Sequence, residues 1–205
     1  MSTDERLHDY LRQSLDVAAR CGYGREDDVI ERFEEQVRDE LHDQEPEARE
    51  AALATWMAEL GRALTEQRAR EQGWTEPTHN DRIDTAFAEL RRRGIVALQD
   101  AGYTMSDGWE DVHEARRRVK GAWGATFFHR QDVERGVDGR GLMLAYGAFA
   151  DGDEHEPQSL RLAREVCEVL EAHGVPTRWS GSLSARIEVL PFEWRKRRWT
   201  RAPQG

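Results

Sequence analysis

The stretch Gly94-Ile95-Val96-Ala97-Leu98 marks the point where the chain changes from helical to strand periodicity. Before it, apolar residues recur at intervals of three and four, which is the spacing of amphipathic helices. The apolar run that follows Gly94 is short and continuous, as is typical of a buried strand. Beyond it, strand-like segments and helical segments follow one another. This change of period predicts an α+β fold.

The C-terminal half is predicted to contain two strand pairs separated by a helix. Segments 125–131 and 142–149 flank a loop rich in glycine and charge, which predicts a hairpin with a long connection. A helix is predicted over 160–170, and segments 175–179 and 185–190 are predicted to form a second hairpin. We therefore expect a mostly antiparallel sheet of about five strands, with helices packed on one face.

The last predicted strand alternates in polarity. Ala185, Ile187 and Val189 are apolar, whereas Arg186 and Glu188 between them are charged. Successive side chains of a strand point to opposite faces of the sheet. One face is therefore expected to pack on helices, and the other to meet solvent or a ligand.

The N-terminal third is predicted to form an acidic helical module. Apolar stripes with helical spacing around Leu11, Phe33 and Leu60 predict three helices. Residues 1–73 hold 19 acidic and 10 basic side chains, whereas residues 74–205 hold 21 and 20. We therefore predict two domains. The acidic module spans 1–73, and an α+β domain spans 74–205 and ends in a basic tail rich in Trp and Arg.

The charge of the chain limits the partners that we expect. A formal net charge of −10 repels phosphate backbones and anionic membranes, so binding to nucleic acid or to a membrane is not expected. The same charge suits a basic protein partner. Lysine is present only at positions 120 and 196, and this preference for arginine indicates a GC-rich bacterial genome.

Cysteine usage and hydropathy predict a cytoplasmic protein without a bound metal. Cys21 and Cys167 lie in different predicted helices and lack CxxC spacing, so neither a zinc site nor a disulfide is predicted, and no cofactor is expected. No apolar run reaches the length of a membrane helix, and the first residues lack the pattern of a signal peptide.

The second half of the chain contains five short motifs: Asn80-Asp81-Arg82-Ile83, Arg93-Gly94-Ile95-Val96-Ala97, Gly102-Tyr103-Thr104-Met105-Ser106-Asp107-Gly108, Phe128-His129-Arg130-Gln131-Asp132 and Trp179-Ser180-Gly181. Together they resemble a family of bacterial, largely actinobacterial proteins described as a domain of unknown function. The resemblance covers roughly residues 74–199 and not the acidic helices. Some relatives carry a CCxxCG motif where this chain has Tyr103–Gly108, so no thiol chemistry carries over. The resemblance implies a shared fold and no activity.

His129 and Asp132 are the candidate catalytic residues. A histidine beside a carboxylate can transfer protons or bind a metal ion. The alternative is structural, with His129 as a cross-strand polar residue and Asp132 capping a turn. The sequence alone leaves both interpretations open, because a motif without its geometric context is weak.

Aromatic and basic residues form two further candidate sites. The basic tail could bind phosphates or stack on bases, or it could lie against the acidic helices; it contains Trp194, Arg195, Lys196, Arg197, Arg198, Trp199 and Arg201. The second set would be a ligand-binding surface if its members converge on the open sheet face; it contains Trp109, Trp123, Tyr146, Trp179 and Arg186. Helical spacing favours a packing role for the first two. We name Tyr146, Trp179, Arg186 and Arg197 as candidate ligand-binding residues.

These observations favour a bacterial interaction or regulatory module over an enzyme. It would bind a protein or a small anionic ligand through the open sheet face. An immunity-like role, in which acidic side chains mask the basic site of a toxin, is one form of this hypothesis. The alternative is a hydrolase or phosphate-handling enzyme that uses His129 and Asp132, with Arg186 and Arg197 holding an anion. A third hypothesis is binding of single-stranded nucleic acid by the basic tail.

Overall fold

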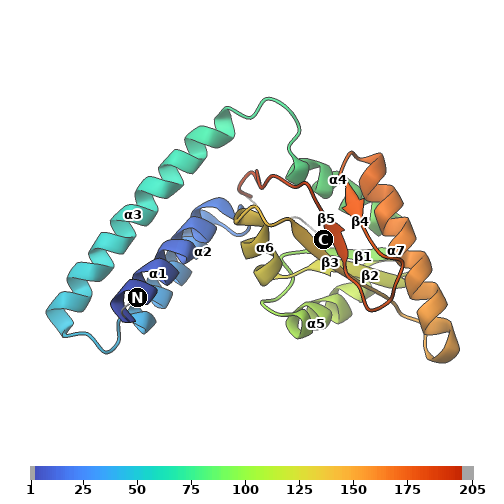
Figure 1. Ribbon diagram of the computed structural model, residues 1–205, viewed down its shortest axis with the longest axis horizontal. Coiled ribbons are helices and arrows are strands. Elements are labelled where there is room, and N and C mark those ends of the chain that lie inside the picture. The colour runs from blue at the N-terminus through green and yellow to red at the C-terminus, as the bar shows by residue number, and fades with distance from the viewer. Residues whose placement is uncertain (1–2, 200–205) are drawn as a thin grey trace. The chain divides into compact units, whose positions relative to one another are not determined.

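The chain forms two compact units, which a computed structural model describes over residues 3–199 (Figure 1). The first unit extends to Glu76 and also contains the segment that begins at Lys196. The second unit extends from Pro77 to Arg195. The structure therefore groups Lys196–Trp199 with the N-terminal helices, whereas the sequence pattern grouped this segment with the α+β domain.

The first unit contains the three helices that the sequence predicts: α1 (Thr3–Arg20), α2 (Glu26–Glu40) and α3 (Pro46–Gln72). Apolar side chains spaced by three and four residues line one face of each helix and meet in a shared core. The buried members of this core are Leu11, Leu15, Ala19, Phe33, Val37, Leu41, Leu53, Trp56, Leu60 and Leu64. Among residues 3–199, no helix is both long enough and apolar enough to span a membrane.

The second unit combines a sheet with four α-helices. Its elements in chain order are α4 (His79–Arg92), β1 (Ile95–Gln99), α5 (Met105–Ala115), the 3-10 turn η1 (Arg116–Arg118), β2 (Gly124–Phe128), α6 (Arg130–Val137), β3 (Leu142–Ala148), the 3-10 turn η2 (Gly152–Glu154), α7 (His155–Ala172), β4 (Thr177–Arg178) and β5 (Ile187–Val189). The prediction of an α+β fold with five strands is confirmed.

The five strands form one mixed sheet in the order β1-β2-β3-β5-β4. The pairs β2–β3, β3–β5 and β4–β5 are antiparallel, in agreement with the prediction of a mostly antiparallel sheet. The pair β1–β2 is parallel, and α5 lies in the connection between these strands. A parallel pair requires such a crossover, which carries the chain over one face of the sheet.

Helices therefore pack around the sheet and not only on the one face that we predicted. Phe127 contacts Trp109 of α5, with ring centroids 5.1 Å apart. The next residue, Phe128, points to the opposite face and contacts Phe87 of α4 at 5.9 Å. On this second face, α7 also packs, since Leu162 closely approaches Gly124. The apolar spacing of Trp109, Val112 and Ala115 predicts a helix here, but the sequence does not show which face of the sheet this helix covers.

The segment between β2 and β3 is also different from the prediction. We expected a strand to residue 131 followed by a loop, but β2 ends at Phe128 and α6 occupies Arg130–Val137. Helix α6 begins with a capping arrangement in which the Asp132 carboxylate accepts the backbone N–H of His129. Its apolar residue Val133 is fully buried. A polar cap and a buried helix face thus replace part of the predicted long hairpin loop.

Candidate functional site

The candidate catalytic residues lie where the parallel strands β1 and β2 end. Each of these strands is followed by a short turn and then by the start of a helix, α5 or α6. The two turns are joined by a hydrogen bond in which the backbone N–H of Arg130 donates to the Gly102 carbonyl at 3.0 Å. Ligands of open α/β sheets bind at the carboxyl ends of parallel strands, so this edge is a reasonable place for a site.

Asp132 is at the centre of a polar cluster at this edge. Its Oδ2 accepts the backbone N–H of His129 at 3.1 Å and lies 3.2 Å from His129 Nδ1. Arg186 Nη2 donates to the same carboxylate oxygen at 2.5 Å and to the Met143 carbonyl at 2.7 Å. The side chains of His129 and Asp132 are 6% and 5% exposed, and that of Arg186 is 27% exposed. The fold thus brings His129 and Asp132, which cap α6, next to Arg186, the residue directly before β5.

Burial favours the neutral form of the His129 imidazole. Loss of solvent lowers the pKa of His129, and this effect outweighs the nearby Asp132 carboxylate, which acts in the opposite direction. Nδ1 of His129 lies 3.2 Å from the Asp132 carboxylate but makes no hydrogen bond of regular geometry within residues 3–199. A neutral imidazole can accept a proton or bind a metal ion. In the same range, no three His, Cys, Asp or Glu side chains are grouped so as to hold a metal.

A second ion pair lies in the turns next to this cluster. Arg130 Nη2 is 2.6 Å from Asp100 Oδ2, and both side chains are mostly buried. Asp100 has a φ of 55°, a conformation that non-glycine residues adopt rarely. Neither residue was predicted as part of a site, although Arg130 lies in the Phe128–Asp132 motif. Their positions directly after two strands were the signal that could have identified them.

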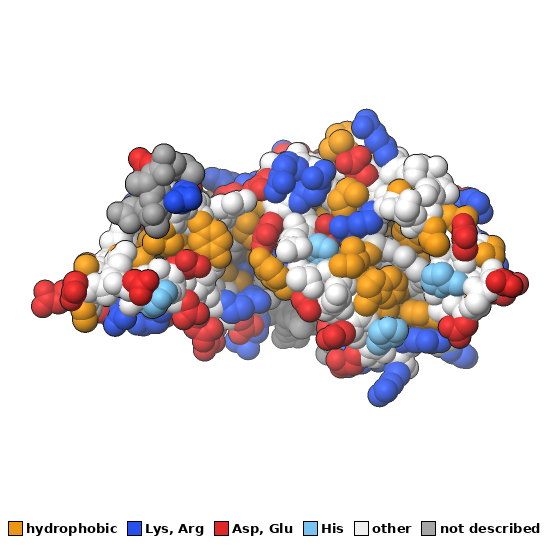
Figure 2. Space-filling model, turned by 60° about the horizontal axis from the view of Figure 1, so that its bottom comes forward, with side chains coloured by type: hydrophobic (Ala, Val, Ile, Leu, Met, Phe, Trp, Pro, Cys, Tyr) orange, Lys and Arg blue, Asp and Glu red, His pale blue; other side chains and the backbone are white. Residues whose placement is uncertain are grey.

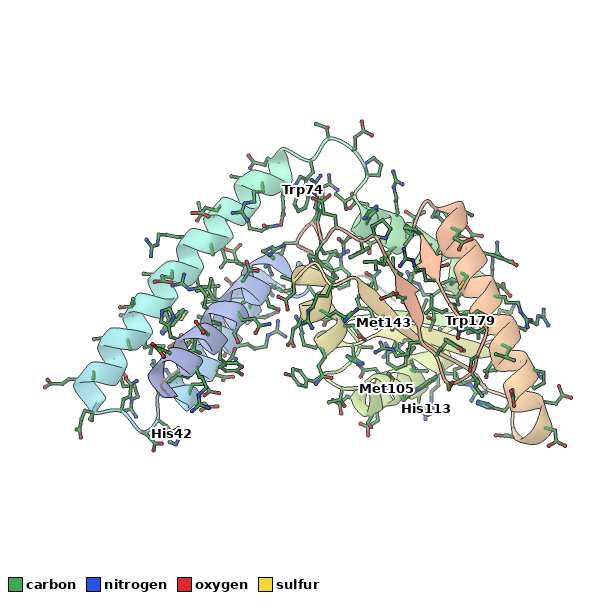
Figure 3. The ribbon with its side chains drawn as sticks, viewed as in Figure 1. His42, Trp74, Met105, His113, Met143 and Trp179 are labelled. Carbon is green, nitrogen blue, oxygen red and sulfur yellow. The ribbon has the colours of Figure 1, made fainter. Side chains whose placement is uncertain are left out.

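Tyr146 and Trp179 form a separate pair. Their rings are perpendicular, with centroids 5.7 Å apart, and Trp179 Nε1 donates to Tyr146 Oη at 3.0 Å and to the Ala185 carbonyl at 3.2 Å. Tyr146 Oη donates in turn to the Ser182 carbonyl at 2.9 Å. Burial raises the pKa of Tyr146. The pair therefore fixes both ends of the loop that precedes β5, and Figure 3 shows Trp179 beside this loop.

The sheet register separates this pair from Arg186. Leu144 lies opposite Ile187, so the two side chains share a face, and Tyr146 follows Leu144 on that face. Arg186 precedes Ile187 and points to the other face. Arg197 belongs to the first unit, where its guanidinium donates to the Trp74 carbonyl at 2.7 Å. The four residues named as ligand-binding candidates thus occupy three different places in the fold.

One face of β3 and β5 is covered by α7, and the opposite face is covered in part by α6. Leu142, Leu144, Ile187 and Val189 are fully buried on the face that α7 covers. The alternating residues Met143, Arg186 and Glu188 on the opposite face are only partly buried, and we refer to these three as the β3–β5 face. Figure 3 labels Met143 of this face and Met105 of α5, and Figure 2 shows hydrophobic side chains exposed among charged ones.

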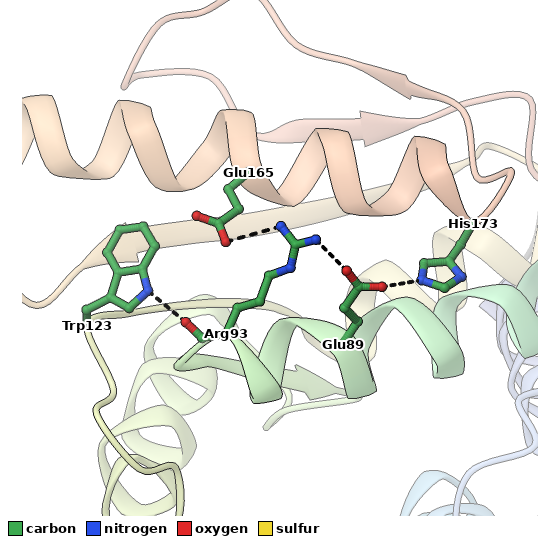
Figure 4. Close-up of polar contacts among 5 residues, drawn as sticks. All are labelled: Glu89, Arg93, Trp123, Glu165 and His173. Carbon is green, nitrogen blue, oxygen red and sulfur yellow. Dashed lines mark hydrogen bonds and ion pairs between the residues drawn. The ribbon is translucent and has the colours of Figure 1, made fainter.

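Trp123, for which a packing role was predicted, takes part in a polar network between α4 and α7 (Figure 4). Glu89 accepts hydrogen bonds from His173 at 2.8 Å and from Arg93 at 2.5 Å, and these bonds lower the pKa of Glu89. Arg93 also reaches Glu165 at 3.5 Å, while the Trp123 indole donates to the Arg93 carbonyl at 3.1 Å. These contacts tie two helices together and do not form part of the candidate site.

Comparison with known proteins places the chain in a family. A family model matches residues 4–198, which include the acidic helices that the sequence motifs do not cover. A search of curated proteins and a search of solved structures each gave no match. The chain belongs to the family described as Domain of unknown function (DUF6891).

Proposed function

We propose that the chain is a bacterial, cytoplasmic binding module that holds a small anionic ligand on the β3–β5 face of its second unit. The observation that carries this proposal is the incomplete hydrogen bonding of the Arg186 guanidinium. Its two side-chain hydrogen bonds to the described part of the chain both use one nitrogen, Nη2. Its Nε is a buried donor without a hydrogen-bond partner among the described residues 3–199. The Arg186 side chain is 27% exposed, so a carboxylate or phosphate oxygen of a ligand would accept a hydrogen bond from the solvent-facing part of this guanidinium and not from the buried Nε.

The surroundings of Arg186 suit a ligand that has an apolar part next to its anionic group. Met143 lies next to Arg186 on the same face and is partly exposed. Met105 and Trp109 of α5 pack, also partly exposed, against a core cluster that includes Ala145 of β3. Sites for small molecules commonly combine apolar walls with a few polar groups that fix the orientation.

The charge around Arg186 favours a small ligand over a polyanion. Asp132 already pairs with Arg186, and Arg135 lies 3.5 Å from Glu188 on the same face. The opposite charges nearly cancel, so the face provides one directional donor group and no extended positive field. Free thiols at Cys21 and Cys167 support the reducing cytoplasm as the compartment.

The test is a titration of the full chain with inorganic phosphate and, separately, with succinate, followed by backbone amide NMR. We expect shifts of resonances in β3 and β5 at millimolar ligand, and about tenfold weaker binding for Arg186→Lys, which keeps the charge opposite Asp132 but loses the planar donor group. Arg178→Gln on β4 is the control, because it removes an exposed arginine from the same sheet. Equal binding by the Arg186→Lys variant and the wild-type chain would rule out Arg186 as the anchor.

A further inference from the structure

The segment Lys196–Trp199 is held in the first unit like a bound peptide. It has no regular secondary structure, and it pairs with no strand. Its backbone makes individual contacts instead, such as the hydrogen bond from the Trp199 N–H to the Gly22 carbonyl at 3.0 Å. Its side chains make further contacts with the first unit. We call Lys196–Trp199 the C-terminal segment.

Lys196 is enclosed by aromatic rings. It is 1% exposed, and its Nζ lies 5.3 Å from the ring centre of Tyr23 and 4.9 Å from that of Trp199. The two rings meet edge to face with centroids 4.9 Å apart. This arrangement provides cation–π attraction for a lysine head and apolar surface for its stem.

Gly22 provides the space for this lysine. Its φ of +78° is a conformation that glycine adopts easily. A Cβ at this position would lie 2.3 Å from Lys196 Cγ and 2.9 Å from the Lys196 carbonyl oxygen. Any larger residue would therefore exclude the lysine. The turn after α1 is shaped to receive the C-terminal segment.

The two arginines of the segment bind to oxygens of the first unit. Arg198 Nη2 donates to the carbonyls of Ala18 and Ala19 at 2.9 and 2.8 Å, in the last turn of α1. Carbonyls in the last turn of a helix lack partners within the helix and carry its negative dipole end, so they favour a cation. The Arg198 N–H also donates to Glu71 at 3.3 Å, and Arg197 binds the Trp74 carbonyl. The site therefore recognises positive charge followed by an aromatic ring.

From this arrangement we infer that the first unit is a receptor for basic-aromatic peptide segments, and that the C-terminal segment occupies the receptor site as a built-in competitor. The partner would be a protein segment with the pattern of Lys196–Trp199, in which basic residues precede a tryptophan. None of the contacts requires the peptide to be covalently connected to the unit. The connection, which runs through the second unit, only raises the local concentration of the segment, on the order of millimolar. This inference is independent of the ligand proposed for the second unit.

The experiment uses the full chain with Trp199→Ala and a fluorescent peptide that has the sequence of residues 195–205. The substitution removes the ring that contacts Tyr23 and Lys196, which weakens the built-in competitor. We expect the peptide to bind this variant, and to bind the wild-type chain at least tenfold more weakly because the intact segment competes. A peptide with alanine in place of Lys196 is the matched control and should not bind.

A second variant tests whether the peptide uses the same site. Gly22→Ala combined with Trp199→Ala should abolish peptide binding, because the added methyl group occupies the space of the lysine. If the Trp199→Ala chain loses helical circular dichroism, addition of the peptide should restore it. The inference is overturned if the folded Trp199→Ala variant binds no peptide at about 1 mM, the local concentration of a tethered segment. The inference is also overturned if the double variant binds the peptide as tightly as the Trp199→Ala chain does. The same holds if the peptide does not restore a helical signal that the Trp199→Ala chain has lost.

Discussion

Replacement of Asp132 by Asn isolates the electrostatic part of the candidate site. Asparagine keeps an oxygen that can accept the His129 N–H, so the cap of α6 is retained. What is lost is the charge opposite Arg186. Breaking a fully buried ion pair costs about 3–5 kcal/mol, whereas an exposed pair contributes about 0–1 kcal/mol. Asp132 is buried but Arg186 is 27% exposed, so we expect a loss of about 2 kcal/mol.

Amide hydrogen exchange of β3 measures this loss within the second unit alone. A loss of about 2 kcal/mol corresponds to exchange about 30-fold faster for the protected amides of Leu142–Ala148. Asp138→Asn is the control, because Asp138 pairs with the largely exposed Arg140 at 2.8 Å and should change exchange only slightly. Equal acceleration of exchange by Asp132→Asn and Asp138→Asn would refute a stabilising role for the Asp132–Arg186 ion pair. So would a failure of Arg186→Met to recover stability in the Asp132→Asn background, where it removes the unpaired charge.

Three further outcomes are expected. Gly108→Ala would place a Cβ 2.2 Å from the Phe127 ring, so thermal unfolding should show a loss of about 1–3 kcal/mol; an unchanged melting temperature would contradict the packing described here. Because burial lowers the pKa of His129, the unfolded chain binds a proton at higher pH than the folded chain does, and the free energy of unfolding should decrease as pH falls below about 6.5. Denaturant titrations of His129→Gln should show a weaker dependence of stability on pH, and the same pH dependence as in the wild-type chain would contradict this prediction. Tyr146→Phe removes the hydroxyl bonded to Trp179, so limited proteolysis should cut the loop before β5 faster than in the wild-type chain, and equal rates would show that the bond does not hold the loop.

The sequence predicted elements where apolar spacing is regular. The stripes around Leu11, Phe33 and Leu60 gave three helices, and the apolar run at Ile95 gave β1. Helix α6 was missed because it has only 8 residues and its N-cap is His129, and histidine is not a usual capping residue. The parallel pairing of β1 with β2 was missed because it depends on a crossover, and no local pattern encodes the pairing partner of a strand.

The candidate site was predictable in its local part only. His129 and Asp132 are three residues apart, so the start of one helix brings them together. Arg186 reaches them through the register of the sheet, which short motifs do not reveal. The same register sends Tyr146 to the opposite face, so residues that look equivalent in the sequence separate in the fold. Because side chains alternate between the two faces of a strand, this separation follows from the residue numbers once the strand pairing is known.

The return of Lys196–Trp199 to the first unit affects how the protein is made. Helices α1–α3 are synthesised before the second unit, but the residues that contact Tyr23 and bind the end of α1 are synthesised only after the whole second unit. Domains that are contiguous in sequence can complete their folding during translation. Helices α1–α3 can therefore complete their packing only after the second unit has been synthesised and the chain has been extended to Trp199.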